Sequence, residues 1–332
     1  MFLLLNSLLH SFSSTTALAN VLIGFLLLNF SCSICRVWLD NLAFHYRGRF
    51  FKVLKNLLAI CREKRYNMNM NFDLHVHTHY STDSSETMQA HCNRAAALGM
   101  DAVCFTDHLD FQGRDLGYYR PEAYFEELVR NREEFAGRLN ILAGVEISEP
   151  HLHRAELEQM NQLPYDFILG AVHHWDWEDA ARTKASHMQK RFYQGALSEE
   201  ERSGSFRAYW EHMRQMAACG GFDAVAHIDF PKRYLGCLEY QMDMLDEIFA
   251  LMAKNKLLLE VNTSSLRCGL TEPLPGEALL RQYIAGGGKY VTLGSDAHRA
   301  EDLYTGIPET RTWLEQLGLE AVCFEARRMK RV

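Results

Sequence analysis

The sequence predicts an α/β fold: a β/α barrel of about seven parallel strands that begins near residue 70 and continues to residue 332. Two observations predict it. From Asn71 onward, short apolar runs alternate with longer amphipathic stretches, which is typical of parallel β/α units. Nearly every apolar run also ends in a histidine or a carboxylate, and the strand ends of such a barrel converge on one face.

The expected strands follow one another at intervals that leave room for connecting helices. These strands are residues 72–76, 102–106, 140–145, 167–172, 224–226, 257–261 and 290–293. The expected helices are residues 87–98, 121–135, 206–219, 241–253 and 276–285. Because an open sheet needs fewer repeats than this, we expect the sheet to close. Residues 175–205 are polar and irregular, and we expect a long loop or small insertion over the barrel mouth.

The first 69 residues differ from the rest of the chain. Residues 17–35 are nearly uncharged, and five basic residues follow between positions 36 and 55. Three interpretations remain open: a membrane anchor with a positive flank, an uncleaved signal-like region, or upstream sequence translated from a start codon placed too early. We favour the third, because Met68 and Met70 stand immediately before the first strand. We therefore expect an extension over residues 1–69 and a barrel over residues 70–332.

The composition limits the class of protein. With 48% hydrophobic and 23% charged residues in 332, the chain is typical of a folded globular protein. A net charge of −7 argues against a nucleic-acid partner. Nine cysteines contain a single Cys-x-x-Cys pair, Cys32 and Cys35, which fits reduced thiols in a cytoplasmic protein. The oligomeric state is left open.

Residues that commonly bind metals stand at the expected strand ends. They are His75 and His77, Asp107 and His108, Glu146, His173 and His174, His227 and Asp229, Glu260 and Asn262, and Asp296 and His298. Any one of them alone would be read as an ordinary surface or core group. Their recurrence at most strand ends indicates a metal site, and a mixture of imidazoles and carboxylates suits zinc, manganese or iron.

Strand geometry narrows this set. His75 and His77 point the same way, because side chains alternate along a strand, so both can bind one metal. His173 and His174 face opposite ways for the same reason, and we choose His173. Asp83 follows the first strand on a loop, where it is either a ligand or the N-terminal cap of a helix.

The order of the motifs resembles the PHP (polymerase and histidinol phosphatase) superfamily, and most of all its histidinol-phosphatase branch. The similarity runs from Asn71 to near the C-terminus, and ordered motifs are more specific than any single pair of histidines. The motifs are Asp-Leu-His-Val-His-Thr at 73–78, Phe-Thr-Asp-His at 105–108, Gly-Val-Glu-Ile at 144–147, Gly-Ala-Val-His at 170–173, Ala-His-Ile-Asp at 226–229, Glu-Val-Asn-Thr at 260–263 and Gly-Ser-Asp-Ala-His at 294–298.

The resemblance implies a distorted seven-stranded (β/α)7 barrel with three divalent metal ions (Zn, Mn or Fe) at the C-terminal strand ends. The implied ligands are His75, His77, Glu146 and Asp296 for the first metal; Glu146, His173 and His227 for the second; and Asp83, His108 and His298 for the third. Among them it implies catalytic roles for Glu146, Asp296 and His298.

Two arginines can bind a phosphate group. Arg267 and Arg233 each follow an expected strand end, and a guanidinium fork matches phosphate oxygens. For each, the alternative is a surface salt bridge.

The resemblance implies hydrolysis of a small phosphorylated substrate, L-histidinol phosphate, in cytoplasmic histidine biosynthesis. Two metals would lower the pKa of a bridging water, and the resulting hydroxide would attack phosphorus. One alternative keeps the metals but acts on another small phosphomonoester or a phosphotyrosine. A nuclease is disfavoured because the chain has no basic track. A non-catalytic metal-stabilised scaffold is disfavoured because all nine positions carry ligand-type residues. A membrane partner is expected only if residues 1–69 form a real anchor.

Overall fold

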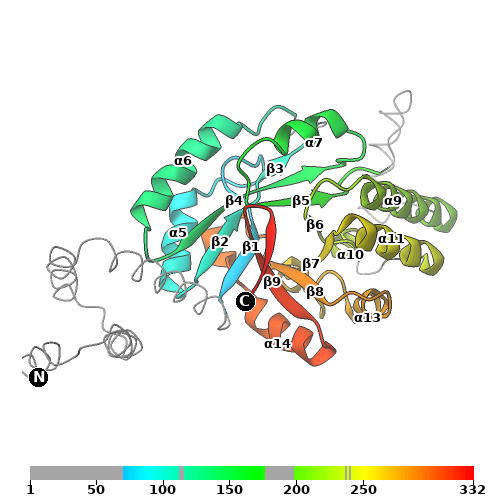
Figure 1. Ribbon diagram of the computed structural model, residues 1–332. Coiled ribbons are helices and arrows are strands. Elements are labelled where there is room, and N and C mark those ends of the chain that lie inside the picture. Colours follow the sequence, from blue (N-terminus) through cyan, green and yellow to red (C-terminus); the bar gives the residue numbers. More distant parts are fainter. Residues whose placement is uncertain (1–69, 112–115, 176–197, 236–237, 239–240) are drawn as a thin grey trace, which may run out of the picture. The chain divides into compact units, whose positions relative to one another are not determined.

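The computed structural model describes residues 70–111, 116–175, 198–235, 238 and 241–332 (Figure 1). The expectations for residues 1–69, and for most of residues 175–205, fall outside the described residues. Within the described residues, no helix is both long and apolar enough to span a membrane.

The described strands and helices alternate along much of the chain. The strands are β1 (Phe72–Val76), β2 (Ala102–Phe105), β3 (His108–Leu109), β4 (Asn140–Ser148), β5 (Phe167–Ala171), β6 (Ala224–Val225), β7 (Leu258–Asn262), β8 (Tyr290–Gly294), β9 (Glu320–Glu325) and β10 (Arg328–Arg331). The helices are α5 (Met88–Ala97), α6 (Pro121–Glu134), α7 (Arg154–Met160), α9 (Glu199–Cys219), α10 (Lys232–Leu235), α11 (Met242–Asn255), α12 (Ser264–Arg267), α13 (Glu277–Ala285), the 3-10 helix η3 (Ala300–Asp302) and α14 (Ile307–Leu317).

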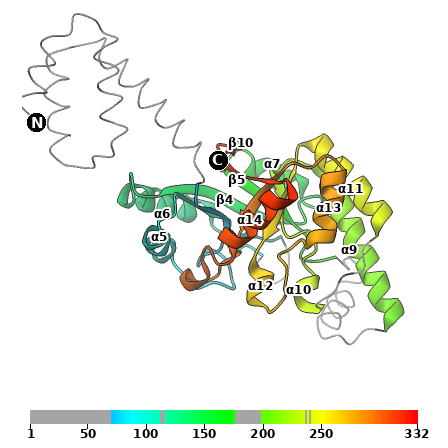
Figure 2. The same ribbon diagram turned by 90° about the horizontal axis from the view of Figure 1, so that it is seen from below.

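The strands form a mostly parallel sheet. Their order is β1-β2-β4-β5-β6-β7-β8-β9-β10, with β3 beside β4, and among these pairings only β9 with β10 is antiparallel. In two perpendicular views α5 and α6 lie on one side of the strands, and α9, α11 and α13 lie on the other (Figures 1 and 2). Strands β1, β2 and β5 are buried throughout, as is usual for the strands of a parallel sheet.

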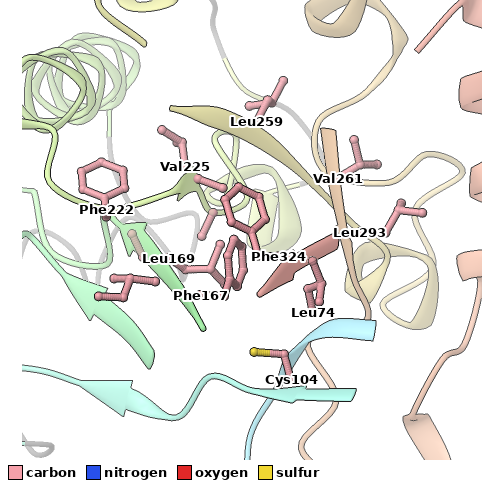
Figure 3. Packing of buried hydrophobic residues seen from close by; sticks show 14 of the residues in the cluster. Leu74, Cys104, Phe167, Leu169, Phe222, Val225, Leu259, Val261, Leu293 and Phe324 are labelled. Carbon is pink, nitrogen blue, oxygen red and sulfur yellow. The ribbon is translucent and has the colours of Figure 1, made fainter. Parts of the chain in front are cut away.

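The sheet is strongly curved. Phe167 on β5 and Phe324 on β9 belong to strands that are not neighbours in the sheet, yet their ring centroids are 5.0 Å apart. Figure 3 shows these two rings and Leu169 close together between the strands. The end of β1 also approaches the end of β8, since His77 N donates to Ala297 O at 2.9 Å. The carboxyl ends of distant strands are therefore brought near one another.

Tyr124 on α6 fixes the place where β4 leaves β2. Its hydroxyl donates to Phe105 O at 2.8 Å and accepts from Gly144 N at 2.9 Å. Two residues further on, Glu146 pairs with His108 on β3 instead of with β2. The turn of β4 away from β2 thus places Glu146 at the edge where the other strands end.

The expected elements are largely present, with three corrections. All seven expected strands occur, as β1, β2 and β4 to β8, but β3, β9 and β10 were not expected. Helices α7, α10, α12 and α14 and the 3-10 helix η3 lie where no helix was expected. The expected loop was wrong for residues 199–205, because α9 begins at Glu199. Ser198 and Glu201 cap its first turn reciprocally: Ser198 Oγ accepts from Glu201 N at 3.2 Å, and Glu201 Oε2 accepts from Ser198 N at 2.9 Å.

Candidate metal centre

The nine predicted ligands all lie within the described residues, at or just beyond the carboxyl ends of parallel strands. They are His75 on β1, His77 and Asp83 after it, His108 on β3, Glu146 on β4, His173 after β5, His227 after β6, and Asp296 and His298 after β8. Since parallel strands present their carboxyl ends at one edge of a sheet, the fold gathers these side chains.

Glu146 lies at the middle of the cluster, with its carboxylate fully buried. Five imidazole nitrogens surround it: His227 Nε2 and His108 Nδ1 at 2.9 Å, His75 Nε2 at 3.4 Å, His173 Nε2 at 3.6 Å and His77 Nε2 at 3.7 Å. Neither oxygen of Glu146 has a hydrogen-bond partner among the described residues. A buried carboxylate without hydrogen bonds, ringed by imidazoles, fits a site for bound cations.

Buried Asp296 and partly exposed Asp83 extend the cluster. Asp296 Oδ1 lies 3.3 Å from His77 Nε2 and 3.5 Å from His298 Nδ1. Asp83 Oδ2 lies 3.3 Å from His298 Nε2 and 3.6 Å from His108 Nε2. The side chains of Asp83 and His298 are 40% and 25% exposed, whereas that of His77 is fully buried. The centre is therefore open on the side of Asp83 and His298.

Several groups of side chains in the described residues could each hold a metal ion. In each group the ligand atoms lie within 4.8 Å of one another. The groups are His77, His108 and His298; His75, His77 and Asp296; His75, Glu146 and His227; and His108, Glu146 and His173. Asp83 and His174 are in none of them. The donor set of imidazoles and carboxylates suits zinc, manganese or iron.

Neighbouring hydroxyl groups hold two of the imidazoles. His77 Nδ1 lies 3.1 Å from Ser81 Oγ, which donates to Asp107 at 2.7 Å. His173 Nδ1 lies 2.7 Å from Ser148 Oγ. Such partners fix the orientation of a ligating ring. Neither serine was found from the sequence, because a serine near a strand end is common and carries no distinguishing signal.

The buried charges set the protonation of the centre. Burial raises the pKa of a carboxyl group, but His75, His173 and His108 together outweigh it and keep the pKa of Glu146 well below its usual range. For Asp296, burial is outweighed by Arg233 together with the surrounding histidines, and its pKa is also well below its usual range. Burial lowers the pKa of His77 well below its usual range. Ionised carboxylates and a neutral imidazole are the forms that bind metal ions.

The two predicted phosphate-binding arginines differ in their contacts. Arg233 Nη2 donates to Asp296 Oδ2 at 2.5 Å and to Ser264 Oγ at 2.6 Å, so its guanidinium borders the cluster. Arg267 donates through Nη1 to Ser295 O at 2.8 Å and through Nη2 to Asp296 O at 2.9 Å. Arg267 thus supports the backbone that carries Asp296, and Arg233 contacts its carboxylate.

The chain is similar in sequence to known proteins. A histidinol-phosphatase from Lactococcus lactis is 29% identical over 250 residues, which cover 72% of this chain and 88% of that protein. A probable histidinol-phosphatase from Deinococcus radiodurans is 27% identical over 258 residues, covering 74% of this chain and 92% of that protein.

Solved structures are similar as well. The crystal structure of histidinol phosphate phosphatase from Lactococcus lactis, complexed with zinc, L-histidinol and phosphate, matches with a TM-score of 0.65 and 26% identity, and the match covers 79% of this chain and 99% of that chain. The family model of the PHP domain matches residues 73–264, more than half of the sequence. This chain therefore belongs to the PHP domain family.

Proposed function

We infer that this chain is a histidinol-phosphatase, a phosphoric monoester hydrolase that converts L-histidinol phosphate to L-histidinol and phosphate. The observation that carries the inference is the buried Glu146 carboxylate, ringed by imidazoles, with the Arg233 guanidinium beside the cluster. A site of this kind combines cation ligands with a phosphate-binding group. The similarity to a protein whose structure contains zinc, L-histidinol and phosphate supports the choice of substrate.

We propose that three divalent ions occupy the centre, held by the nine residues that the sequence assigned. The overlapping groups of imidazoles and carboxylates support more than one ion, with Glu146 shared between neighbours. When bound, such ions supply a water of lowered pKa as the nucleophile and neutralise phosphate charge. Zinc has the most support, because the structure of the Lactococcus lactis relative contains it.

The chain's own residues would orient the ester. The phosphate group would enter on the exposed side of the centre, near Asp83 and His298. There Arg233 would bind phosphate oxygens, since a guanidinium remains charged at all working pH values. Arg267 is the second proposed phosphate-binding residue, because its Nη1 and Nη2 each carry a second N–H besides the one that donates to the backbone. Glu146, Asp296 and His298 are the proposed catalytic residues.

We further propose that residues 70–332 form one distorted barrel of seven strands, β1, β2 and β4 to β8. Asp296 N donates to His75 O at 2.8 Å, which joins the carboxyl end of β8 to β1. At its other end β8 pairs with β9, at Tyr290 with Glu320. Strand β8 therefore contacts β1 at its carboxyl end and β9 at its amino end. This change of neighbour along β8 is the proposed distortion of the barrel. Histidine biosynthesis in the cytoplasm is the proposed setting.

The test is phosphate release by the full-length protein, loaded with zinc or manganese, from L-histidinol phosphate and from a panel of other phosphomonoesters that includes phosphotyrosine. A kcat/KM for L-histidinol phosphate well above that for the panel is the expected result. Activity confined to other esters would keep the metal chemistry and reject the substrate. No hydrolysis of any ester by metal-loaded protein would reject the proposed function.

A further inference from the structure

Glu260 on β7 contacts two of the predicted ligands without lying among them. It is 1% exposed, and its carboxylate accepts three hydrogen bonds. His75 Nδ1 is 2.6 Å from Oε1, and Oε2 accepts from His227 N at 2.9 Å and from Asn262 Nδ2 at 3.2 Å. The carboxylate therefore holds one ligand by its ring and another by its backbone.

The contact lies on the side of the His75 ring that faces away from the cluster. His75 Nε2 is the nitrogen directed to the other ligands, 3.4 Å from Glu146 and 3.8 Å from Asp296. An imidazole binds a metal through the nitrogen that carries no proton, and a carboxylate at the other nitrogen keeps the proton there. The Glu260 contact thus selects the tautomer that leaves Nε2 free for a metal.

The neighbouring strand leaves room for this pair at Gly294 on β8. A Cβ added at Gly294 would collide with the Cβ of His75 and would lie 2.6 Å from Oε1 of Glu260. Gly294 pairs with Asn262 in the β7–β8 ladder, so the strand itself cannot move aside without loss of that pairing. A glycine at this position is therefore a requirement for the His75–Glu260 contact.

A chain of hydrogen bonds ends at the same carboxylate. Arg233 Nη2 donates to Ser264 Oγ at 2.6 Å, and Ser264 Oγ donates to Asn262 Oδ1 at 2.6 Å. Asn262 Nδ2 then donates to Glu260. Since each group donates to the next, Glu260 is the last acceptor in this series of hydrogen bonds and fixes the orientation of its members. The proposed phosphate-binding arginine and the metal ligand His75 share one anchor.

We propose that Glu260 is a positioning residue of the metal centre: it holds the proton on His75 Nδ1 and the backbone at His227, so that His75 presents Nε2 to a bound metal. Glu260 thus contacts proposed ligands and is not itself a proposed ligand, unlike the strand-end acids Glu146 and Asp296. The inference rests on the proposed metal-dependent function and deepens it.

The test compares Glu260→Gln and Gly294→Ala with the wild type. Zinc affinity is measured by competition with a chromophoric chelator on the full-length protein. Both variants should bind at least one zinc ion about 10- to 100-fold more weakly, the usual effect of losing a partner behind a metal-bound histidine. The control is Asp223→Asn, a buried carboxylate bonded to Ile168 N and Arg327. It should lower the thermal stability and leave zinc affinity unchanged.

A second measurement requires no variant. In the zinc-loaded wild type, nitrogen-15 NMR of the histidine rings should find the proton of His75 on Nδ1. A proton on Nε2, or wild-type zinc affinity in folded Glu260→Gln, would overturn the positioning role. A wild type that binds zinc but does not hydrolyse L-histidinol phosphate would instead reject the proposed function and leave this inference standing.

Discussion

Replacing Glu146 by glutamine should remove metal binding and activity together. The substitution keeps the volume of a fully buried side chain but removes its charge and one acceptor oxygen. In the wild type this carboxylate lies within 3.7 Å of five imidazoles and has no hydrogen bond among the described residues, so cations are the partners it fits. Breaking a buried charge pair by removing one partner costs roughly 3–5 kcal/mol. At 1.4 kcal/mol per factor of ten, metal affinity should fall by about 100-fold to a few thousand-fold.

Elemental analysis after dialysis against metal-free buffer measures the first effect, and phosphate release from L-histidinol phosphate measures the second. Glu320→Gln is the matched control, because Glu320 is partly exposed and pairs with Arg331. It should retain metal and activity. A Glu146→Gln variant that keeps its full metal content and full turnover would refute the central role assigned to this carboxylate.

Three further predictions concern the same centre. Arg233→Ala should raise KM about 10- to 100-fold, as expected for loss of charge-assisted hydrogen bonds. Arg214→Ala, in a partly exposed ion pair on α9, should leave KM unchanged. Equal KM values for the two variants in steady-state kinetics would contradict this prediction. His173→Ala should lower the bound zinc and His174→Ala should not, and elemental analysis that gave the reverse would exchange their roles. In metal-free protein, burial alone would lower the pKa of His173, but Glu146 and Asp110 together raise it to about 10, above its ordinary 6.5. The protonated ring therefore stabilises the fold below pH 6.5, and this stabilisation is lost as the pH rises toward 10. Thermal unfolding should show the metal-free protein losing stability over that window relative to zinc-loaded protein, and parallel pH profiles would contradict it.

The gathering of the proposed ligands could be predicted because it follows from strand geometry. His75, Glu146 and His227 each stand where an apolar run ends, and parallel strands bring such ends together. The alternation of side chains also gave reason to prefer His173 to His174. These arguments need only the local sequence and the direction of the chain.

The supporting residues could not be predicted in the same way. Glu260 and Glu146 are both acids on buried strands, and the sequence does not show that one faces the centre of the cluster and the other the back of an imidazole. That distinction depends on the curvature of the sheet and on the space left by Gly294, which arise only when β7, β8 and β1 meet. Strand β9 was missed for a related reason, since its short apolar run shows its role only when Phe324 packs against Phe167.

Two of the proposed ligands have a strained backbone. His227 and Asp296 have φ values of 20° and 56°, in the left-handed region that non-glycine residues seldom adopt, although His and Asp are among the side chains enriched there. Such a conformation costs on the order of 1–3 kcal/mol and persists only where surrounding contacts enforce it. Here Glu260 accepts from His227 N, and Arg267 donates to Asp296 O. Both strained positions come just after a strand, β6 for His227 and β8 for Asp296, and a buried or part-buried side chain holds the backbone at each. Glu260 and Arg267 therefore support the proposed metal centre by holding the strained backbone of two of its residues.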